Sequence, residues 1–196
     1  MGAQAIQCGD VYLRPLRITD LAQIMKAIAQ SADELKPFAK WFDCVSEEAE
    51  AEFIRLSQRQ RRMRTDFVYG VFRGTDGLYL GGIGLHDVSF KHRRAELGYW
   101  VRTGFHRRGI ATAASARMLL YAVDDLDLNV VFVRTAVANK SSQAVIRKLG
   151  FREIGRARKD LVLRGRALDH FYYDILATEI KRRTKRLERL YRLKLD

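Results

Sequence analysis

The sequence contains few of the features that mark secreted or membrane-spanning proteins. Only two of its 196 residues are cysteine, and Cys8 and Cys44 are too far apart in the sequence to indicate a disulfide framework. No apolar run approaches the ~20 residues of a membrane-spanning helix. The opening MGAQAIQCGD lacks the basic and then apolar segments of a signal peptide. We therefore expect a cytoplasmic protein without membrane contact.

Histidine and proline are also scarce. The four histidines follow no ligand spacing such as HExxH, so we expect no metal site. There are only two prolines, and no Ser/Gly-rich linker, repeat or low-complexity tract interrupts the chain. We expect a single domain over residues 1–178, followed by a basic, helical extension over residues 179–196.

Acidic residues are outnumbered by basic ones. The chain has 36 Lys and Arg against 23 Asp and Glu, a formal net charge of +13, and eight of the cations lie between Lys181 and Asp196. Such a charge favours polyanions, so ribosome or RNA contact is one expectation and a solvated basic face is the other. Leu187, Leu190 and Tyr191 follow helical spacing. The extension can therefore also dock on its own domain or on a second subunit, which leaves a monomer or a homodimer open.

The first part of the chain carries mainly helical patterns. After a strand-like segment at Val11–Leu16, Thr19 is the predicted N-cap of a first helix. Ser31 and Glu34 have the spacing of a capping box, which predicts a short second helix. A longer helix is predicted from Ser46. Its core-facing stripe is predicted to contain Phe53, Leu56 and Met63.

The middle and end of the chain alternate between strands and helices. DFVYGVF, LYLGGIGLHDV and AELGYWV are rich in β-branched and aromatic residues, which favour strands. A helix from about residue 108 to 123 leads to the strand NVVFVRTAV, and a helix after NKSS ends at Gly150. A strand near 152–157, a turn at RGR and the strand LDHFYYDIL follow. This order predicts an α/β (α+β) fold with a mostly antiparallel central sheet flanked by helices.

The stretch FHRRGIATAA combines two arginines and a glycine at the start of a predicted helix, directly after a strand. A helix N-terminus exposes unpaired backbone N–H groups and about half a positive charge. Gly109 and Ala111 allow an anion to approach this backbone, and Arg107 and Arg108 add charge that suits phosphate. The pattern predicts a phosphate cradle; the alternative is an ordinary helix start with surface arginines.

Three separate motifs follow one another along the chain: the strand ELGYWV, the helix start HRRGIA, and the segment VVFVRTAVANKSSQAVIRKLGF. In this order they resemble the GNAT superfamily of acetyl-CoA-dependent N-acetyltransferases, over residues 10 to 178. YLRPLRITDLAQIM, NKSS, KLGF and DHFYYDI further resemble its RimJ/RimL group, which acetylates the N-terminal amine of ribosomal proteins. The resemblance implies acetyl-CoA as cofactor, coenzyme A as product, and a GNAT fold whose sheet is splayed at its central strands.

The resemblance also implies which residues bind the cofactor. His106 stands where the family loop has Gln or Arg, so one family side chain is lost there. Backbone groups between Tyr99 and Val101 are expected to polarise the thioester carbonyl, and those of Val101 and Thr103 to pair with the pantetheine arm. The full expected set is Tyr99, Trp100, Val101, Thr103, His106, Arg107, Arg108, Gly109, Ile110, Ala111, Thr112, Asn139 and Ser142.

Three residues are candidates for proton transfer. Glu96 shares a predicted strand face with Gly98 and Trp100, and in this family the strand lines the acceptor channel, so Glu96 is the expected base. The alternative for Glu96 is a surface salt bridge to Arg93 or Arg94. His86, next to Asp87, is the second candidate base.

Ser142 is the expected acid for the departing thiolate. Ile146 occupies the place where many GNAT enzymes have a tyrosine for this step. Asn139 and Ser142 both lie at a predicted helix start, so helix capping is the alternative for each.

The sequence leaves the acceptor open. The leading expectation is the N-terminal α-amine of a ribosomal protein, and a small-molecule amine is the alternative within enzymes. A basic RNA- or ribosome-binding module is the alternative of another class. Phe38 and Trp41 are expected either to cover the acceptor or to belong to the core.

Overall fold

The computed structural model describes residues 5–192, 194 and 195. Its strands form one eight-stranded sheet in the order β1-β2-β3-β4-β5-β6-β8-β7, in which only β5 and β6 run parallel. The predicted mixed fold with a mostly antiparallel sheet is therefore confirmed. The strands are β1 (Ile6–Cys8), β2 (Val11–Arg14), β3 (Phe67–Arg73), β4 (Tyr79–Ser89), β5 (Arg94–Val101), β6 (Val130–Ala136), β7 (Arg152–Leu163) and β8 (Arg166–Leu176).

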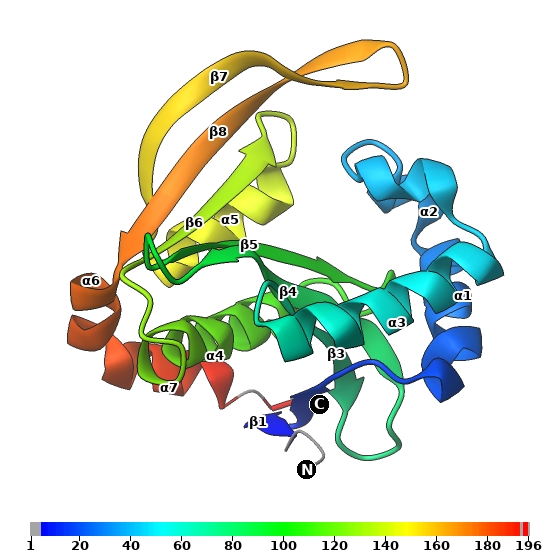
Figure 1. Cartoon of the computed structure of the whole chain (residues 1–196), viewed down its shortest axis with the longest axis horizontal. Coiled ribbons are helices and arrows are strands. Elements are labelled where there is room, and N and C mark those ends of the chain that lie inside the picture. The colour runs from blue at the N-terminus through cyan, green and yellow to red at the C-terminus, as the bar shows by residue number, and fades with distance from the viewer. Residues whose placement is uncertain (1–4, 193, 196) are drawn as a thin grey trace.

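Helices cover both faces of this sheet (Figure 1). They are η1 (Ile18–Asp20), α1 (Leu21–Gln30), α2 (Ala32–Leu35), η2 (Lys40–Cys44), α3 (Glu47–Met63), α4 (Ile110–Asp124), α5 (Lys140–Leu149), α6 (Ala177–Arg182) and α7 (Thr184–Tyr191). On one face α1 and α3 bury Ile24 and Ile54 against Val68. On the other face α4 and α5 bury Met118 and Ile146 in the larger core. No helix among the described residues is long and apolar enough to cross a membrane.

The sheet opens between its two parallel central strands. β5 and β6 are paired only from Arg94–Val130 to Glu96–Phe132. Beyond Glu96, β5 continues beside β4, whereas β6 continues beside β8. This separation is the splay that the family resemblance implied. It leaves one edge of β5 without a neighbouring strand.

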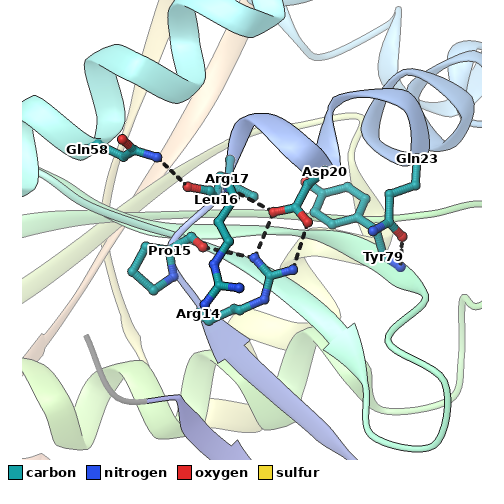
Figure 2. A network of polar contacts seen from close by, with 8 residues as sticks. All are labelled: Arg14, Pro15, Leu16, Arg17, Asp20, Gln23, Gln58 and Tyr79. Carbon is teal, nitrogen blue, oxygen red and sulfur yellow. Dashed lines mark hydrogen bonds and ion pairs between the residues drawn. The ribbon is translucent and has the colours of Figure 1, made fainter. Parts of the chain in front are cut away.

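The start of α1 differs from the prediction, because Thr19 lies within η1 and caps no helix. The carboxylate of Asp20 orders this segment instead (Figure 2). It accepts two hydrogen bonds of 2.7 Å from the Arg14 guanidinium and one of 2.8 Å from the Arg17 amide. A bidentate arginine holds a carboxylate more strongly than a hydroxyl can hold a helix start.

The capping box predicted for Ser31 and Glu34 is also wrong. Ser31 is at the N-cap of α2 but makes no capping bond, because its hydroxyl donates to Ala27 O at 2.7 Å. The same hydroxyl accepts from the Thr103 amide at 3.0 Å. Ser31 therefore ties α1 to the end of β5.

The predicted stripe of α3 is one residue out of phase with the core. Ala51, Ile54 and Ser57 are buried, whereas the predicted Phe53, Leu56 and Met63 are 39%, 43% and 60% exposed. Small residues at the interface let the helix approach the sheet closely, and hydrophobicity alone does not indicate this. The predicted start is confirmed, since Ser46 accepts from the Ala49 amide at 3.1 Å.

The C-terminal extension docks on its own chain. Leu187 of α7 is fully buried, and Leu190 and Tyr191 pack against the same core as α4. Arg186 donates to Lys148 O at 2.9 Å. The apolar side of α7 is therefore covered by the domain, and its basic side faces outward.

Candidate active site

The turn between β5 and α4 is the segment for which the sequence predicts a phosphate cradle. Gly104, Arg107 and Gly109 all have positive φ, of 87°, 63° and 79°. Gly109 is the N-cap of α4, and no side chain caps the helix start. The first-turn N–H groups are therefore available to a ligand, and the exposed Arg107 and Arg108 stand beside them.

Thr103 and His106 contact the helical layer rather than the cradle. The Thr103 amide donates to Ser31, and its hydroxyl donates to the Glu34 carboxylate. The His106 Nε2 atom is 2.8 Å from Val101 O, and its Nδ1 atom is 3.8 Å from Glu34. The Thr103 amide already has a partner, so the expected pairing of the Thr103 backbone with pantetheine is left to its carbonyl group.

The free edge of β5 offers backbone groups of alternate residues. The Arg102 amide donates to Leu80 O of β4 at 2.8 Å. Because alternate residues of an antiparallel ladder point to the same neighbour, the N–H groups of Tyr99 and Val101 face the splay. The backbone of Trp100 instead pairs with Gly82 of β4. The centroid of its ring lies 6.1 Å from that of Trp41, so its side chain lies on the opposite face of the sheet, which α1 and α3 cover.

Two hydroxyls meet on the α4/α5 side of the splay. The Tyr99 hydroxyl oxygen lies 3.1 Å from Ser142 Oγ and donates to Ser142 O at 3.2 Å. Burial raises the pKa of Tyr99 to about 12, so its proton is retained at neutral pH. Asn139 caps α5 by accepting from the Ser142 amide at 3.0 Å, as the capping alternative predicted. The alternation of β5 already placed the Tyr99 side chain on this face, but not its partner.

Glu96 lies at the point where the splay begins, and it is paired. Its Oε1 atom is 3.0 Å from Nε of Arg134 on β6. The partner is thus neither Arg93, which pairs with Asp127, nor Arg94, so that part of the salt-bridge alternative is wrong. If Glu96 acted as a base, its protonation would remove the negative charge that pairs with this guanidinium.

His86 lies opposite Glu96 on β4, on the face that carries Trp100. Its Nδ1 atom is 3.3 Å from Oδ1 of Asp66, at the start of β3. Asp87, the neighbour expected from the sequence, is exposed and has a φ of 50°. The sequence offered no signal for Asp66, which is brought near only by the pairing of β3 with β4.

The long β7–β8 hairpin adds contacts that the sequence did not indicate. It extends beyond the rest of the sheet toward the side of α2 (Figure 1). At its tip, Arg164 donates to Lys36 O and pairs with the carboxylate of Asp43 in η2. The tip of the hairpin and the α2–η2 segment are therefore joined by these contacts.

A second polar cluster lies along the hairpin. Tyr172 donates to Asp160 at 2.9 Å, and Nδ1 of His170 is 3.2 Å from the same carboxylate. Burial lowers the pKa of His170, against the opposing effect of Asp160. Among the described residues, no three His, Cys, Asp or Glu side chains gather where a metal could bind.

Comparison with known proteins agrees with this geometry. A protein of Bacillus subtilis (strain 168), named provisionally as the ribosomal N-acetyltransferase YdaF, is 34% identical over 173 residues, which are 86% of this chain and 92% of that protein. A crystal structure named as that of a probable acetyltransferase is 32% identical with a TM-score of 0.83, and covers 91% of this chain and 99% of its own.

Two further matches complete the comparison. Mycobacterium smegmatis RimJ, solved in complex with a CoA disulfide, shares the fold with a TM-score of 0.83 at 24% identity, over 93% of each chain. Residues 10–152 match the family described as the acetyltransferase (GNAT) domain. With its splayed sheet and open helix start, this chain belongs to the GNAT family of acetyltransferases.

Proposed function

We propose that this protein transfers an acetyl group from acetyl-CoA to the N-terminal α-amine of a protein in the cytoplasm, with ribosomal proteins as the first candidate acceptors. One observation carries the proposal: two features lie beside the opening between β5 and β6. The uncapped start of α4 follows the end of β5, and the hydroxyls of Tyr99 and Ser142 are in contact on the face covered by α4 and α5. The name of YdaF as a ribosomal N-acetyltransferase supports this choice of acceptor.

The residues around the splay fit acetyl-CoA, which supplies the acetyl thioester when it is bound. The N–H groups of Ile110, Ala111 and Thr112 would hold the pyrophosphate, because no acidic residue lies in the first turn of α4 to compete. Arg107 and Arg108 add charge there. The bound CoA disulfide in RimJ supports a coenzyme A ligand for this fold.

The backbone of β5 and the hydroxyls would act on the reacting end. The N–H groups of Tyr99 and Val101 face the splay and would orient the ligand and polarise its carbonyl; such a donor is typically worth ~10²–10³ in rate. Ser142 Oγ would donate a proton to the departing thiolate and take one in return from the newly acylated nitrogen. Tyr99, whose proton is retained, would hold Ser142 in place.

The chemistry of the acceptor side suits an α-amine. A protein α-amine has a pKa of about 7.7–8.0 against about 10.4 for lysine, so a modest base makes it neutral near physiological pH. Glu96 and His86 lie opposite each other on this face of β4 and β5 and are the candidate bases. Trp41 and Trp100 form an adjacent aromatic wall for the acceptor's first residues.

The test is acetylation of peptides that differ only at the amine. Purified protein and acetyl-CoA are incubated with peptides that begin with Ala, Ser or Met, with the same peptides blocked at the N-terminus, and with small amines. Thiol release and mass spectrometry should show acetylation of free N-termini alone. Acetylation of small amines or of lysine instead would overturn the proposed acceptor.

We further propose that the basic face of the extension contacts ribosomal RNA. The apolar side of α7 is buried, whereas Lys181, Arg182, Lys185 and Arg189 are exposed. Substitution of both Lys185 and Arg189 by Glu should weaken binding to ribosomes. The slope of log K against log salt concentration should become less steep by about two, since two phosphate contacts are lost. Turnover of a free peptide should not change, and ribosome binding equal to that of the wild type would contradict the proposal.

A further inference from the structure

We propose that His86, positioned by Asp66, accepts the proton of the acceptor amine in place of Glu96. This inference rests on the proposed function, since it names the base for that same acetyl transfer. The N–H bond of the acceptor ammonium breaks, the proton binds the lone pair of His86 Nε2, and the imidazolium charge is paired with the Asp66 carboxylate. The neutral amine then has the lone pair that acylation requires.

The contact between Asp66 and His86 orients the imidazole. Oδ1 of Asp66 lies 3.3 Å from Nδ1, and the Asp66 side chain is only 13% exposed. A carboxylate at Nδ1 favours the tautomer that carries its hydrogen there, which leaves the lone pair on Nε2. The Val88 amide donates to Thr65 O at 2.9 Å, so the chain on both sides of this contact is tied together.

Two glycines make room for the ring over the sheet. A Cβ atom at Gly84 would lie 2.9 Å from His86 Nε2, and a Cβ atom at Gly98 would lie 3.2 Å from it. The imidazole therefore lies across β4 and β5 at positions where any side chain would displace it. Gly98 is two residues beyond the last pair of β5 with β6, so Nε2 stands beside the splay.

The charged groups next to His86 explain why it is the better base. They are Asp66 at the start of β3, Glu96 opposite it on β5, and Arg134 on β6. Arg134 is occupied by Glu96, so its charge is compensated and does not oppose an imidazolium. Protonation of Glu96 would break that ion pair, whereas protonation of His86 adds one with Asp66.

The experiment compares pH profiles of kcat with a peptide acceptor. His86→Gln should lower kcat by about 10²-fold or more and remove the acid limb that a histidine base produces. Affinity for acetyl-CoA, measured by calorimetry, should be unchanged. Imidazole in the buffer should restore activity to His86→Ala, which a purely structural histidine would not allow.

Asp66 and Glu96 give the discriminating variants. Asp66→Asn should lower kcat about tenfold and move the acid limb to lower pH, because the imidazolium loses its carboxylate. Glu96→Gln should keep the acid limb. Its kcat should fall by at most about tenfold, because the positive charge of Arg134 then has no carboxylate partner at Glu96. His92→Gln, an exposed histidine in the turn before β5, is the matched control and should match the wild type.

The outcomes separate this inference from the acceptor proposal. If the wild type acetylates only small amines, the proposal of a protein N-terminus as acceptor is wrong. The His86 inference is then tested by the pH profiles of the same variants with the small amine that the wild type acetylates. A full acid limb in His86→Gln would overturn the inference. Loss of that limb in Glu96→Gln would overturn it as well and restore Glu96 as the base.

Discussion

The hydroxyl oxygen of Tyr99 lies 3.1 Å from Oγ of Ser142, and this contact joins β5 to the start of α5 across the α4/α5 side of the splay. Tyr99 also donates to the carbonyl oxygen of Ser142 at 3.2 Å. Either hydroxyl can be the donor across the 3.1 Å contact, so when Tyr99 donates to Ser142 Oγ the Ser142 proton is free to reach a ligand. A strand and a helix that are far apart in the sequence thus contribute one proton donor.

Removal of either hydroxyl should slow acetyl transfer without unfolding the protein. We expect Ser142→Ala to lower kcat by about 10²-fold and Tyr99→Phe by about tenfold, since a positioned acid typically contributes 10²–10⁴. The double variant should be no slower than Ser142→Ala, because Tyr99 acts through Ser142. Steady-state kinetics with matched urea unfolding curves measure this. Full activity of Ser142→Ala would contradict the role of Ser142 as the acid and leave it only a structural role at the start of α5.

Charge reversal at the start of α4 should weaken cofactor binding. In the variant Arg107→Glu with Arg108→Glu, we expect the Kd for acetyl-CoA to rise by at least about 10²-fold, since hydrogen bonds to charged groups are worth about 1.5–3 kcal/mol each. Isothermal calorimetry measures the change. Arg59→Glu, an exposed arginine on α3, is the control. An unchanged Kd in the double variant would show that the cradle does not bind phosphate.

The bridge from the hairpin tip to η2 should affect the acceptor and not the cofactor. Arg164→Ala removes the contacts with Lys36 O and with Asp43. Because partly exposed ion pairs contribute about 0–1 kcal/mol, we expect the KM for the peptide to rise up to about fivefold at an unchanged Kd for acetyl-CoA. Limited proteolysis should cut the hairpin sooner than in the wild type. Identical peptide KM and cleavage rates would contradict a role in closing the acceptor side.

The Arg14–Asp20 pair should stabilise the fold at neutral pH and lose this effect in acid (Figure 2). Burial opposes ionisation of Asp20, but the bonds from Arg14 and the Arg17 amide outweigh it, so its pKa is lowered. The contribution is therefore present above the unfolded pKa of about 3.9 and is lost as the pH falls through the folded pKa.

Unfolding by urea at two pH values measures this contribution. Asp20→Asn should lower the free energy of unfolding by about 3 kcal/mol at pH 7, since it leaves the Arg14 charge uncompensated. The difference from the wild type should shrink near pH 3, and Asp124→Asn, at an exposed aspartate, should show no such loss. An equal difference at both pH values would contradict the role of the ionised pair.

Local patterns of the chain determined β5 and the start of α4, the elements that we propose bind the cofactor. Alternation along ELGYWV placed Glu96, Gly98 and Trp100 on one face of β5, and the glycine after two arginines marked the start of α4. Both features depend on residues within one turn or one strand, so they are readable without the fold. The phase of α3 was not, because contact with the sheet and not hydrophobicity selects its buried residues.

Only the tertiary structure decided which side chains meet in the site. Glu96 pairs with Arg134 and His86 with Asp66, and each partner comes from a strand, or from the residue just before one, that the sheet order places alongside. A charged side chain has equally plausible partners nearby in the sequence, such as Arg94 or Asp87. Strand pairing between distant segments selects among them, because it fixes which side chains come within the few ångströms where ion pairs and proton transfers occur.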